Sequence, residues 1–315
     1  GDRVNVKLGT HSCTTSSATN GTVTDPIYVR GYVSTIGDLD ALPLGTMVGA
    51  TDIPLILGTG GNLGFRGTHI NQSHLEYRGT TASTYVWYFG NSSRATSCRF
   101  THASASNWAV CNFTDSAALD CYFNGSSGSD LVNSTRGTAI SCTFEGSGLQ
   151  KGTGFNRVIN CVFKDLATGW FPASWYGFLA RGCTFINCTT GCDLNPYNTT
   201  NVVSGCYFSG STTAIKQSGG VGETLVDSCC YHNVTTQLGN LIDSQSNESV
   251  DATDQFVDSA AGDYTLKATS NGYNAVKPNI FAHLGTDTKI DVGAIQHVDA
   301  GGGVTNYNPF RNPVF

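Results

Sequence analysis

Three charged residues near the middle of the sequence could take part in catalysis: Asp120, Glu145 and Lys164. Elimination in a uronic-acid polymer needs clustered carboxylates that hold Ca²⁺ and a basic side chain that removes a sugar proton. Hydrolysis of a glycoside needs two carboxyl groups about 5 Å or about 6.5–9.5 Å apart. These three residues are the sequence's candidates for either reaction.

The spacing of these residues argues against a shared site. On the repeat lattice described below, Asp120 and Glu145 lie one repeat and four positions apart, a separation of more than about 10 Å that is too large for one ion. Glu145 and Lys164 lie in neighbouring repeats, and we expect them to form a surface ion pair. The sequence therefore favours a protein without enzymatic activity, metal or other cofactor, with a lyase or hydrolase site built from loops as the alternative.

An aromatic segment, W-F-P-A-S-W-Y-G-F (170–178), is a candidate for binding because it holds five aromatic residues. Such side chains stack on sugars or fill subunit contacts. We expect Trp170, Trp175 and Tyr176 to serve one of these purposes, and a thick surface turn is the alternative.

The C-terminal tail is the second candidate for binding. Tyr307, Phe310 and Phe315 follow a hinge of three glycines (301–303), and two prolines leave the segment without a helix or strand period. We expect an extended tail that docks on a partner, with a disordered terminus as the alternative.

The twelve cysteines could indicate disulfides or a metal site. A zinc site formed by Cys183, Cys188, Cys192 and Cys206 has a spacing that fits no common finger. Most cysteines instead recur at one position of a repeat, where they would stack as small buried side chains. We therefore expect free thiols and assembly in a reducing compartment.

The triplet Cys, any residue, Phe is the repeat that must position all of these residues. It returns at Cys142, Cys161, Cys183 and Cys206, at intervals of 19, 22 and 23 residues. A period of this length is typical of a solenoid, and two apolar residues at i and i+2 point to the same side of a strand. The predicted core ladder consists of Cys98, Phe100, Cys121, Phe123, Cys142, Phe144, Cys161, Phe163, Cys183, Phe185, Cys206, Phe208, Cys229 and Tyr231.

Further positions extend this pattern. Towards the N-terminus, the ladder is expected to continue through Leu75/Tyr77, Ile53/Leu55 and Ile27/Val29, which gives about ten rungs of 19–26 residues and a stack roughly 45 Å long. Three other columns are expected. Turn residues follow each aromatic by two positions: His102, Gly125, Gly146, Asp165, Asn187, Gly210 and Asn233. A second strand contains Trp170, Cys192, Ile215 and Leu238, and an inward position before each Cys is occupied by Leu119, Ile140, Ile159, Val203 and Val226. Cys111/Phe113 matches the triplet but not the period.

Composition supports an all-β chain and excludes some partners. Gly contributes 38 residues and charged residues only 13%, which suits short strands and tight turns. The net charge of −6 and the lack of a Lys/Arg run give no basic footprint for nucleic acid, and no apolar stretch is long enough to cross a bilayer. Neither nucleic acid nor a membrane is expected as a partner.

Three regions follow from these patterns. Residues 1–250 form the predicted coil, and residues 251–300 form a C-terminal capping segment whose two strand-like pieces (256–267 and 289–296) could close its open end. Residues 301–315 form the hinge and docking tail.

Several segments resemble a known group. The Cys-x-Phe rungs occur together with G-D-x-V-x-V-K-x-G-T and P-I-x-V-R-G-Y near the start, and with F-V-D-x-x-x-G-D-Y-T-L-K and D-V-G-A-I-Q near the end. Over roughly residues 1–296 the chain resembles right-handed, single-stranded parallel β-helix proteins of the pectate-lyase-like superfamily, phage-virion type. Relatives usually carry an amphipathic helix over the first rung; this sequence lacks it, so a partner subunit is expected to cover that edge.

This resemblance implies more about fold than about function, because the fold serves enzymes and structural proteins alike. The first expectation is a structural virion protein of a tailed bacteriophage, a capsid decoration (cement) or fibre-like subunit. Its expected partners are the major capsid protein or other virion subunits, bound through the C-terminal tail, in a homo-oligomer with a trimer favoured. The alternatives are a polysaccharide lyase or glycoside hydrolase acting on an acidic glycan, tailspike-like or secreted, and a non-catalytic module that binds a host-surface glycan. The expected location is the virion, assembled in the host cytoplasm, or otherwise the extracellular space.

Overall fold

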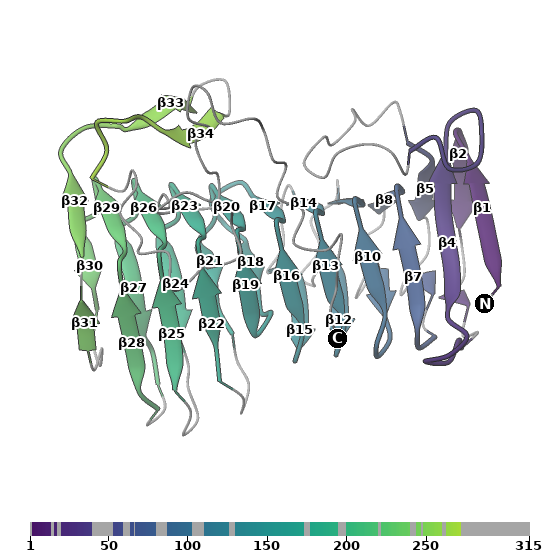
Figure 1. Cartoon of the computed structure of the whole chain (residues 1–315), viewed down its shortest axis with the longest axis horizontal. Helices are drawn as coiled ribbons and strands as arrows, with labels where there is room; N and C mark the ends of the chain where they lie inside the picture. The colour runs from purple at the N-terminus through teal and green to yellow at the C-terminus, as the bar shows by residue number, and fades with distance from the viewer. Residues whose placement is uncertain are drawn as a thin grey trace, which may run out of the picture.

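The computed structural model shows a right-handed parallel β-helix, as the sequence predicts (Figure 1). It describes residues 2–13, 16–17, 20–39, 53–58, 64–65, 67–79, 87–102, 110–125, 130–172, 177–194, 200–219, 222–239, 244–246, 248–259 and 263–271. Within these ranges every regular element is a strand apart from a short turn of 3-10 type at Ser259, and no helix is long and apolar enough to span a membrane.

Three parallel sheets form the sides of the coil. Sheet A contains β1 (Arg3–Lys7), β4 (Ile27–Tyr32), β7 (Ile70–Ser73), β10 (Arg94–Thr96), β13 (Ala117–Leu119), β16 (Thr138–Ile140), β19 (Arg157–Ile159), β22 (Leu179–Arg181), β25 (Asn201–Ser204), β28 (Thr224–Asp227) and β31 (Ser244–Ser246). Sheet B contains β2 (Thr10–Cys13), β5 (Leu55–Gly58), β8 (Glu76–Gly79), β11 (Arg99–His102), β14 (Tyr122–Gly125), β17 (Thr143–Glu145), β20 (Val162–Lys164), β23 (Thr184–Ile186), β26 (Tyr207–Ser209), β29 (Cys230–His232) and β32 (Ser249–Asp251).

The third side, sheet D, contains β9 (Trp87–Phe89), β12 (Cys111–Thr114), β15 (Asp130–Thr135), β18 (Lys151–Thr153), β21 (Thr168–Trp170), β24 (Thr190–Leu194), β27 (Thr213–Gln217) and β30 (Thr236–Leu238). A full turn of the coil passes through sheets D, A and B in that order. Two small sheets pair β3 (Ser16–Ser17) with β6 (Gly64–Phe65), and β33 (Phe256–Asp258) with β34 (Asp263–Leu266).

The Cys-x-Phe triplets mark the corner where sheet A passes into sheet B. Each aromatic side chain lies inside the coil and stacks on the next with a ring spacing of 4.7–5.2 Å from Tyr77 to Phe208, ending at Tyr231. All twelve cysteines are free thiols. Those of the ladder are buried, and each Sγ lies 3.3–3.7 Å from the backbone oxygen two residues earlier, a weak interaction that suits a small, mainly apolar side chain.

The residue just before each ladder position forms a turn that was not predicted from the sequence. Its φ is positive, between 49° and 61°, on eight successive rungs: His74, Ser97, Asp120, Ser141, Asn160, Gly182, Gly205 and Ser228. Small polar residues and glycine tolerate this left-handed conformation best. Of the turn residues that were expected after the aromatic, only Asp165, Asn187, Gly210 and Asn233 have a positive φ.

Several details of register differ from the sequence-based expectation. The inward column of sheet A is Ala95, Ala118, Ala139, Val158, Ala180, Val203 and Val226, so Leu119, Ile140 and Ile159 point outward. Ile56, and not Leu55, is aligned with Tyr77. Ile27 and Val29 belong to sheet A, where Ile27 pairs with Ile70. Cys111 and Phe113 lie in sheet D, beside Trp87 and Phe89.

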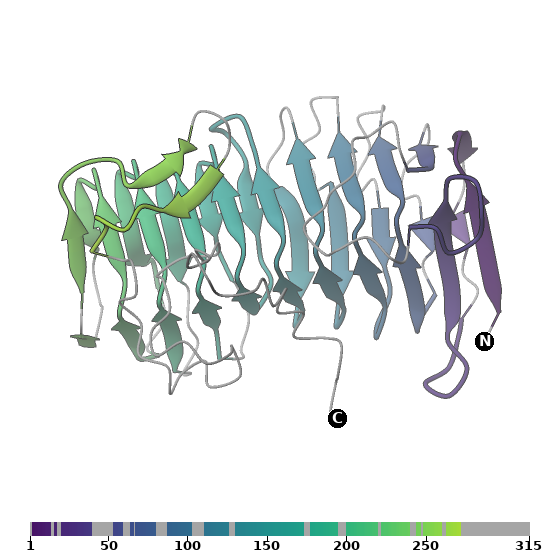
Figure 2. The same cartoon turned by 45° about the horizontal axis from the view of Figure 1, so that its top comes forward.

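The hairpin β33–β34 lies along the outer face of sheet B and does not extend across the last rung (Figures 1 and 2). The rings of Phe256 and Tyr207 are 5.1 Å apart, and the Tyr264 hydroxyl interacts with Lys164. Phe256 and Tyr264 therefore pack against outward residues of β26 and β20, and Leu266 is buried as well. The second predicted closing piece (289–296) and the tail (301–315) lie outside the described residues.

Candidate functional site

Two of the three candidate catalytic residues form the expected ion pair on the outer face of sheet B. Glu145 and Lys164 are aligned on adjacent strands, with Nζ of Lys164 2.9 Å from Oε1 of Glu145. The Tyr122 hydroxyl donates to Oε2 of Glu145 at 2.7 Å. Partial burial works against ionisation of Glu145, but the hydrogen bonds from Lys164 and Tyr122 hold its pKa below the usual value. The hydrogen bond to Glu145 raises the pKa of Lys164.

Asp120 belongs to a different part of the lattice. It occupies the left-handed corner position before β14, with a φ of 51°, and accepts a hydrogen bond of 2.9 Å from the Ser97 hydroxyl on the preceding rung. Asp120 is thus a turn residue, whereas Glu145 ends strand β17. Among the described residues, no group of three or more His, Cys, Asp or Glu side chains could hold a metal ion.

The structure also removes one aromatic candidate. Trp170 is fully buried, and its indole Nε1 donates to the backbone oxygen of Phe155 at 2.6 Å. It is aligned with Cys192 in the core column of sheet D, so the prediction that Trp170 contacts a ligand or partner is wrong. Trp175, Tyr176, Tyr307, Phe310 and Phe315 lie outside the described residues.

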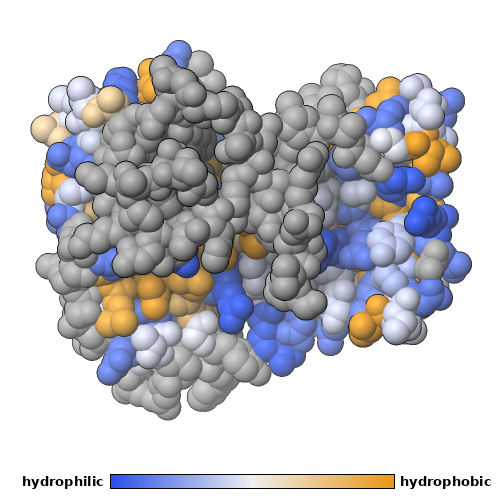
Figure 3. All heavy atoms as spheres, in the orientation of Figure 1, coloured by the Kyte–Doolittle hydropathy of each residue, from blue (hydrophilic) through white to orange (hydrophobic). Residues whose placement is uncertain are grey.

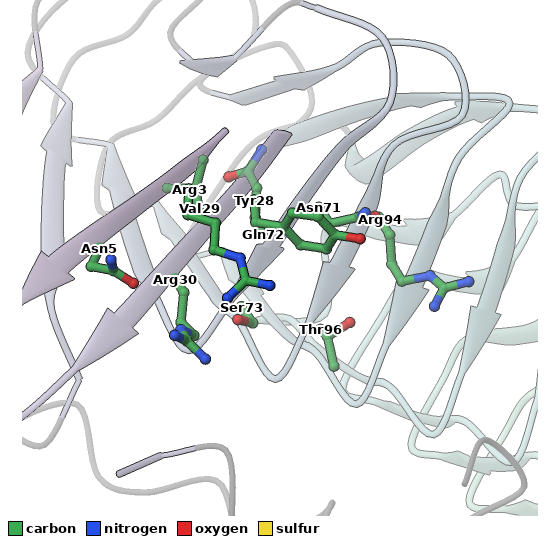
Figure 4. Close-up of a pocket in the computed structure, with 10 residues that line it drawn as sticks. All are labelled: Arg3, Asn5, Tyr28, Val29, Arg30, Asn71, Gln72, Ser73, Arg94 and Thr96. Atoms are coloured by element: carbon green, nitrogen blue, oxygen red, sulfur yellow. The ribbon is translucent and has the colours of Figure 1, made fainter. Parts of the chain in front are cut away.

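A groove on the outer face of sheet A is the site that the structure reveals. It spans the first four strands of the sheet and has a volume of about 440 Å³. Its lining residues are Arg3, Asn5, Tyr28, Val29, Arg30, Asn71, Gln72, Ser73, Arg94 and Thr96. Figure 4 shows Arg3 and Arg30 on one side of the Tyr28 ring and Arg94 on the other.

Parallel pairing of the four strands explains why these residues meet. In one outward column Arg3, Tyr28, Asn71 and Arg94 follow one another on β1, β4, β7 and β10. In the other outward column Asn5, Arg30, Ser73 and Thr96 do the same. Successive strands are about 4.8 Å apart, so residues separated by up to 93 positions in the sequence, such as Arg3 and Thr96, line one short groove.

All charged side chains that line the groove are basic. Its ten lining residues include three guanidinium groups and no Asp, Glu, His or Lys. Elsewhere in the described part of the chain four basic side chains form ion pairs: Arg78 with Glu76, Arg136 with Asp115, Lys164 with Glu145, and Lys216 with Asp193. Neither Arg3 nor Arg94 takes part in an ion pair between described residues. The groove therefore presents positive charge to an anionic ligand.

The sequence did contain a signal for this groove. Arg3 and Arg30 stand at outward positions of two strand-like segments, R-V-N-V-K and I-Y-V-R-G-Y. The candidates Glu145 and Lys164 follow from the Cys-x-Phe repeat and lie on sheet B, whereas the arginines lie on sheet A. The long connections between the first rungs also hide their alignment, because Ile27 pairs with a residue 43 positions later.

Comparison with known proteins identifies the fold. No family model and no curated protein matches the sequence. The structure is similar to pectate lyase Pel9A (TM-score 0.59, 12% identity, covering 95% of this chain and 88% of that one). It is also similar to a PL6 family polysaccharide lyase from Pseudopedobacter saltans (TM-score 0.55, 12% identity, 74% and 59%) and to the PL6 family alginate lyase AlyGC (TM-score 0.51, 12% identity, 74% and 36%). The chain thus has the pectate-lyase-like fold, and it spans less than two thirds of the length of both PL6 family lyases.

Proposed function

We propose that the groove on sheet A binds an acidic polysaccharide. The observation that carries this proposal is the gathering of three arginines, with no carboxylate among the ten lining residues. A guanidinium group keeps its charge at any physiological pH and presents two parallel N–H donors that match a carboxylate. Arg3 and Arg94 would each pair with a carboxylate or sulfate group of the glycan.

The other lining residues suit the neutral parts of a sugar. The side chain of Tyr28 is 41% exposed in the middle of the groove, where its ring can stack on the C–H face of a pyranose. Asn5, Asn71, Ser73 and Thr96 supply donors and acceptors for hydroxyl groups. A site for an inorganic anion alone would need neither the aromatic ring nor this row of polar side chains.

The similar structures support the class of ligand, because pectate and alginate are polymers of uronic acids. The lining itself holds groups that bind and orient an anion, and no carboxylate, imidazole or amine that would commonly act as a general base. We therefore propose binding as the function of this groove, and cleavage is an outcome that the same reagents test.

Titration calorimetry with tetrameric oligouronates from pectate and from alginate tests the proposal. We expect Arg3→Gln and Arg94→Gln each to weaken binding by about 10- to 100-fold, because a hydrogen bond to a charged group contributes about 1.5–3 kcal/mol. Lys216→Gln, which removes one positive charge from sheet D, should leave the affinity unchanged. Equal affinities for all variants, or no binding by the unaltered protein, would contradict the proposal. Release of unsaturated sugars would show that the site also cleaves.

A second proposal concerns the particle in which the protein works: a subunit of a tailed-phage virion, attached through its C-terminal tail. The sequence resemblance supports it, and so does the first rung, where Val4 and Leu8 are 46% and 38% exposed and could be covered by a neighbouring subunit. We expect mass spectrometry of purified particles to detect the chain, and cryo-electron microscopy to show residues 304–315 against the capsid or another virion subunit. Particles that lack the chain would contradict this proposal.

A further inference from the structure

We infer that the binding face extends beyond the groove, along sheet A to Arg157 and Arg181, and that its ligand is a long linear polyuronate lying parallel to the axis of the coil. This inference rests on the proposed function of the groove and adds a second anchoring point. Arg157 lies on β19 and Arg181 on β22. Both side chains occupy outward positions of the same two columns that contain Arg3, Arg30 and Arg94.

The register of sheet A establishes this alignment. The column of Arg3 and Arg94 continues through Ala117, Thr138, Arg157 and Leu179. The column of Arg30 and Thr96 continues through Leu119, Ile140, Ile159 and Arg181. Each step in these two columns is a pair of aligned residues on neighbouring strands. The five arginines therefore form a row two columns wide on sheet A, whose strands are labelled in Figure 1.

The outer face of sheet A is positively charged, whereas the whole chain has a negative net charge. The protein carries 23 acidic residues and a net charge of −6, yet five of its ten arginines project from the outer face of sheet A, together with Lys7. Among the outward positions of the described sheet A strands, Asp227 is the one acidic residue, on the tenth strand. Such a concentration of one charge on one face attracts a polyanion and aligns it.

The second anchoring point also has surfaces for sugar rings. Arg157 is exposed and pairs in register with Leu179, and Ile159 pairs with Arg181. The partly exposed side chains of Ile159 and Leu179 lie between the two guanidinium groups and can pack on the C–H faces of a glycan. In the orientation of Figure 1, a patch of hydrophobic residues lies over the C-terminal rungs, whereas polar and hydrophobic residues are mixed over the N-terminal rungs (Figure 3).

The distance between the groove and the second anchoring point, Arg157 and Arg181, favours long ligands over short ones. Seven strand spacings separate β1 from β22, or roughly 34 Å at about 4.8 Å each. An extended uronate advances by a similar distance per sugar, so a tetramer fills the groove but cannot reach Arg181. A polymer long enough to reach both points binds the second one as an intramolecular step, which raises its affinity through effective concentration.

The test compares two ligands and two sets of variants. We expect Arg157→Gln combined with Arg181→Gln to weaken binding of long polygalacturonate or alginate chains by about 10- to 100-fold, while binding of the tetramers changes less than about twofold. Arg157→Gln alone, at an exposed position, should show a part of the same effect and guards against a folding defect in the double variant. Lys216→Gln combined with Arg136→Gln, which removes the same charge outside the row, should leave both affinities unchanged.

The outcomes separate this inference from the proposed function. If Arg3→Gln weakens binding of the tetramer but the variant with both Arg157→Gln and Arg181→Gln binds long chains normally, the groove binds a glycan as proposed and the extension of the binding face is wrong. If no substitution affects either ligand, the proposed function fails as well. Binding of double-stranded DNA as tightly as a polyuronate of the same charge would show that the face recognises charge alone, and would overturn the assignment to a polysaccharide.

Discussion

Replacement of Phe144 with alanine is expected to lower the free energy of unfolding by about 3–5 kcal/mol. Its ring is fully buried and lies between Phe123 and Phe163, with ring centroids 4.9 Å away on either side and the planes nearly parallel. Alanine would leave a cavity in the middle of an aromatic stack and remove two ring contacts. Because each rung of a solenoid is stabilised by its neighbours, the loss should destabilise the rungs on both sides.

Denaturant unfolding followed by circular dichroism measures this effect. Leu149→Ala is the matched control, since Leu149 is 75% exposed and a surface substitution usually changes stability by less than about 0.5 kcal/mol. Phe144→Leu, which retains most of the volume, should recover much of the loss. A change below about 1 kcal/mol for Phe144→Ala would show that the aromatic stack contributes little to the stability of the coil.

The sequence predicted sheet B well because one pair of residues is repeated on every rung. In a parallel stack, like residues are aligned, so Phe100, Phe123 and Phe144 lie above one another without any shift of register. The column of Trp170, Cys192, Ile215 and Leu238 was also predicted, and the structure confirms its pairing. Most of the fold could therefore be predicted from the regular spacing of the repeated residues.

For several rungs of sheet A the prediction placed the wrong face inward, because the aromatic stack leaves little volume in the interior for large side chains. Leu119, Ile140 and Ile159 are more apolar than their neighbours, which predicts that they face the core. The aromatic stack from sheet B already fills most of the interior, so only small residues such as Ala118 and Ala139 fit on the opposite side. A shift by one residue in a strand reverses the face of every side chain.

That reversal also explains why the basic face was missed. Arginines on sheet A become neighbours only when its register is known, and the first rungs are separated by connections of unequal length. Arg30 and Ser73 are aligned although 43 residues separate them. The Glu145–Lys164 pair, by contrast, lies within the regular part of the repeat, and its prediction from the sequence is confirmed.

Replacement of Gly152 with alanine is expected to cost about 1–3 kcal/mol or more of the free energy of unfolding, as forced overpacking of a core does. A Cβ at Gly152, on β18, would lie 2.2 Å from the backbone oxygen of Gly169 on β21. Since that atom belongs to the main chain, the two strands would have to move apart. A Cβ at Gly154 would instead lie 3.4 Å from its nearest neighbour, the Ser134 oxygen.

Gly154→Ala is thus the control, with an expected change within about 1 kcal/mol. The same pair of variants connects the packing of sheet D to the binding face, because β18 leads directly into β19, which carries Arg157. If the strands separate at Gly152→Ala, the spacing between Arg157 on β19 and Arg181 on β22 changes, and long polyuronates should bind more weakly while tetramers bind as before. Denaturant unfolding and calorimetry with both ligands measure the two effects on the same samples. Equal stabilities of Gly152→Ala and Gly154→Ala would show that the close approach of β18 and β21 is not a constraint on the fold.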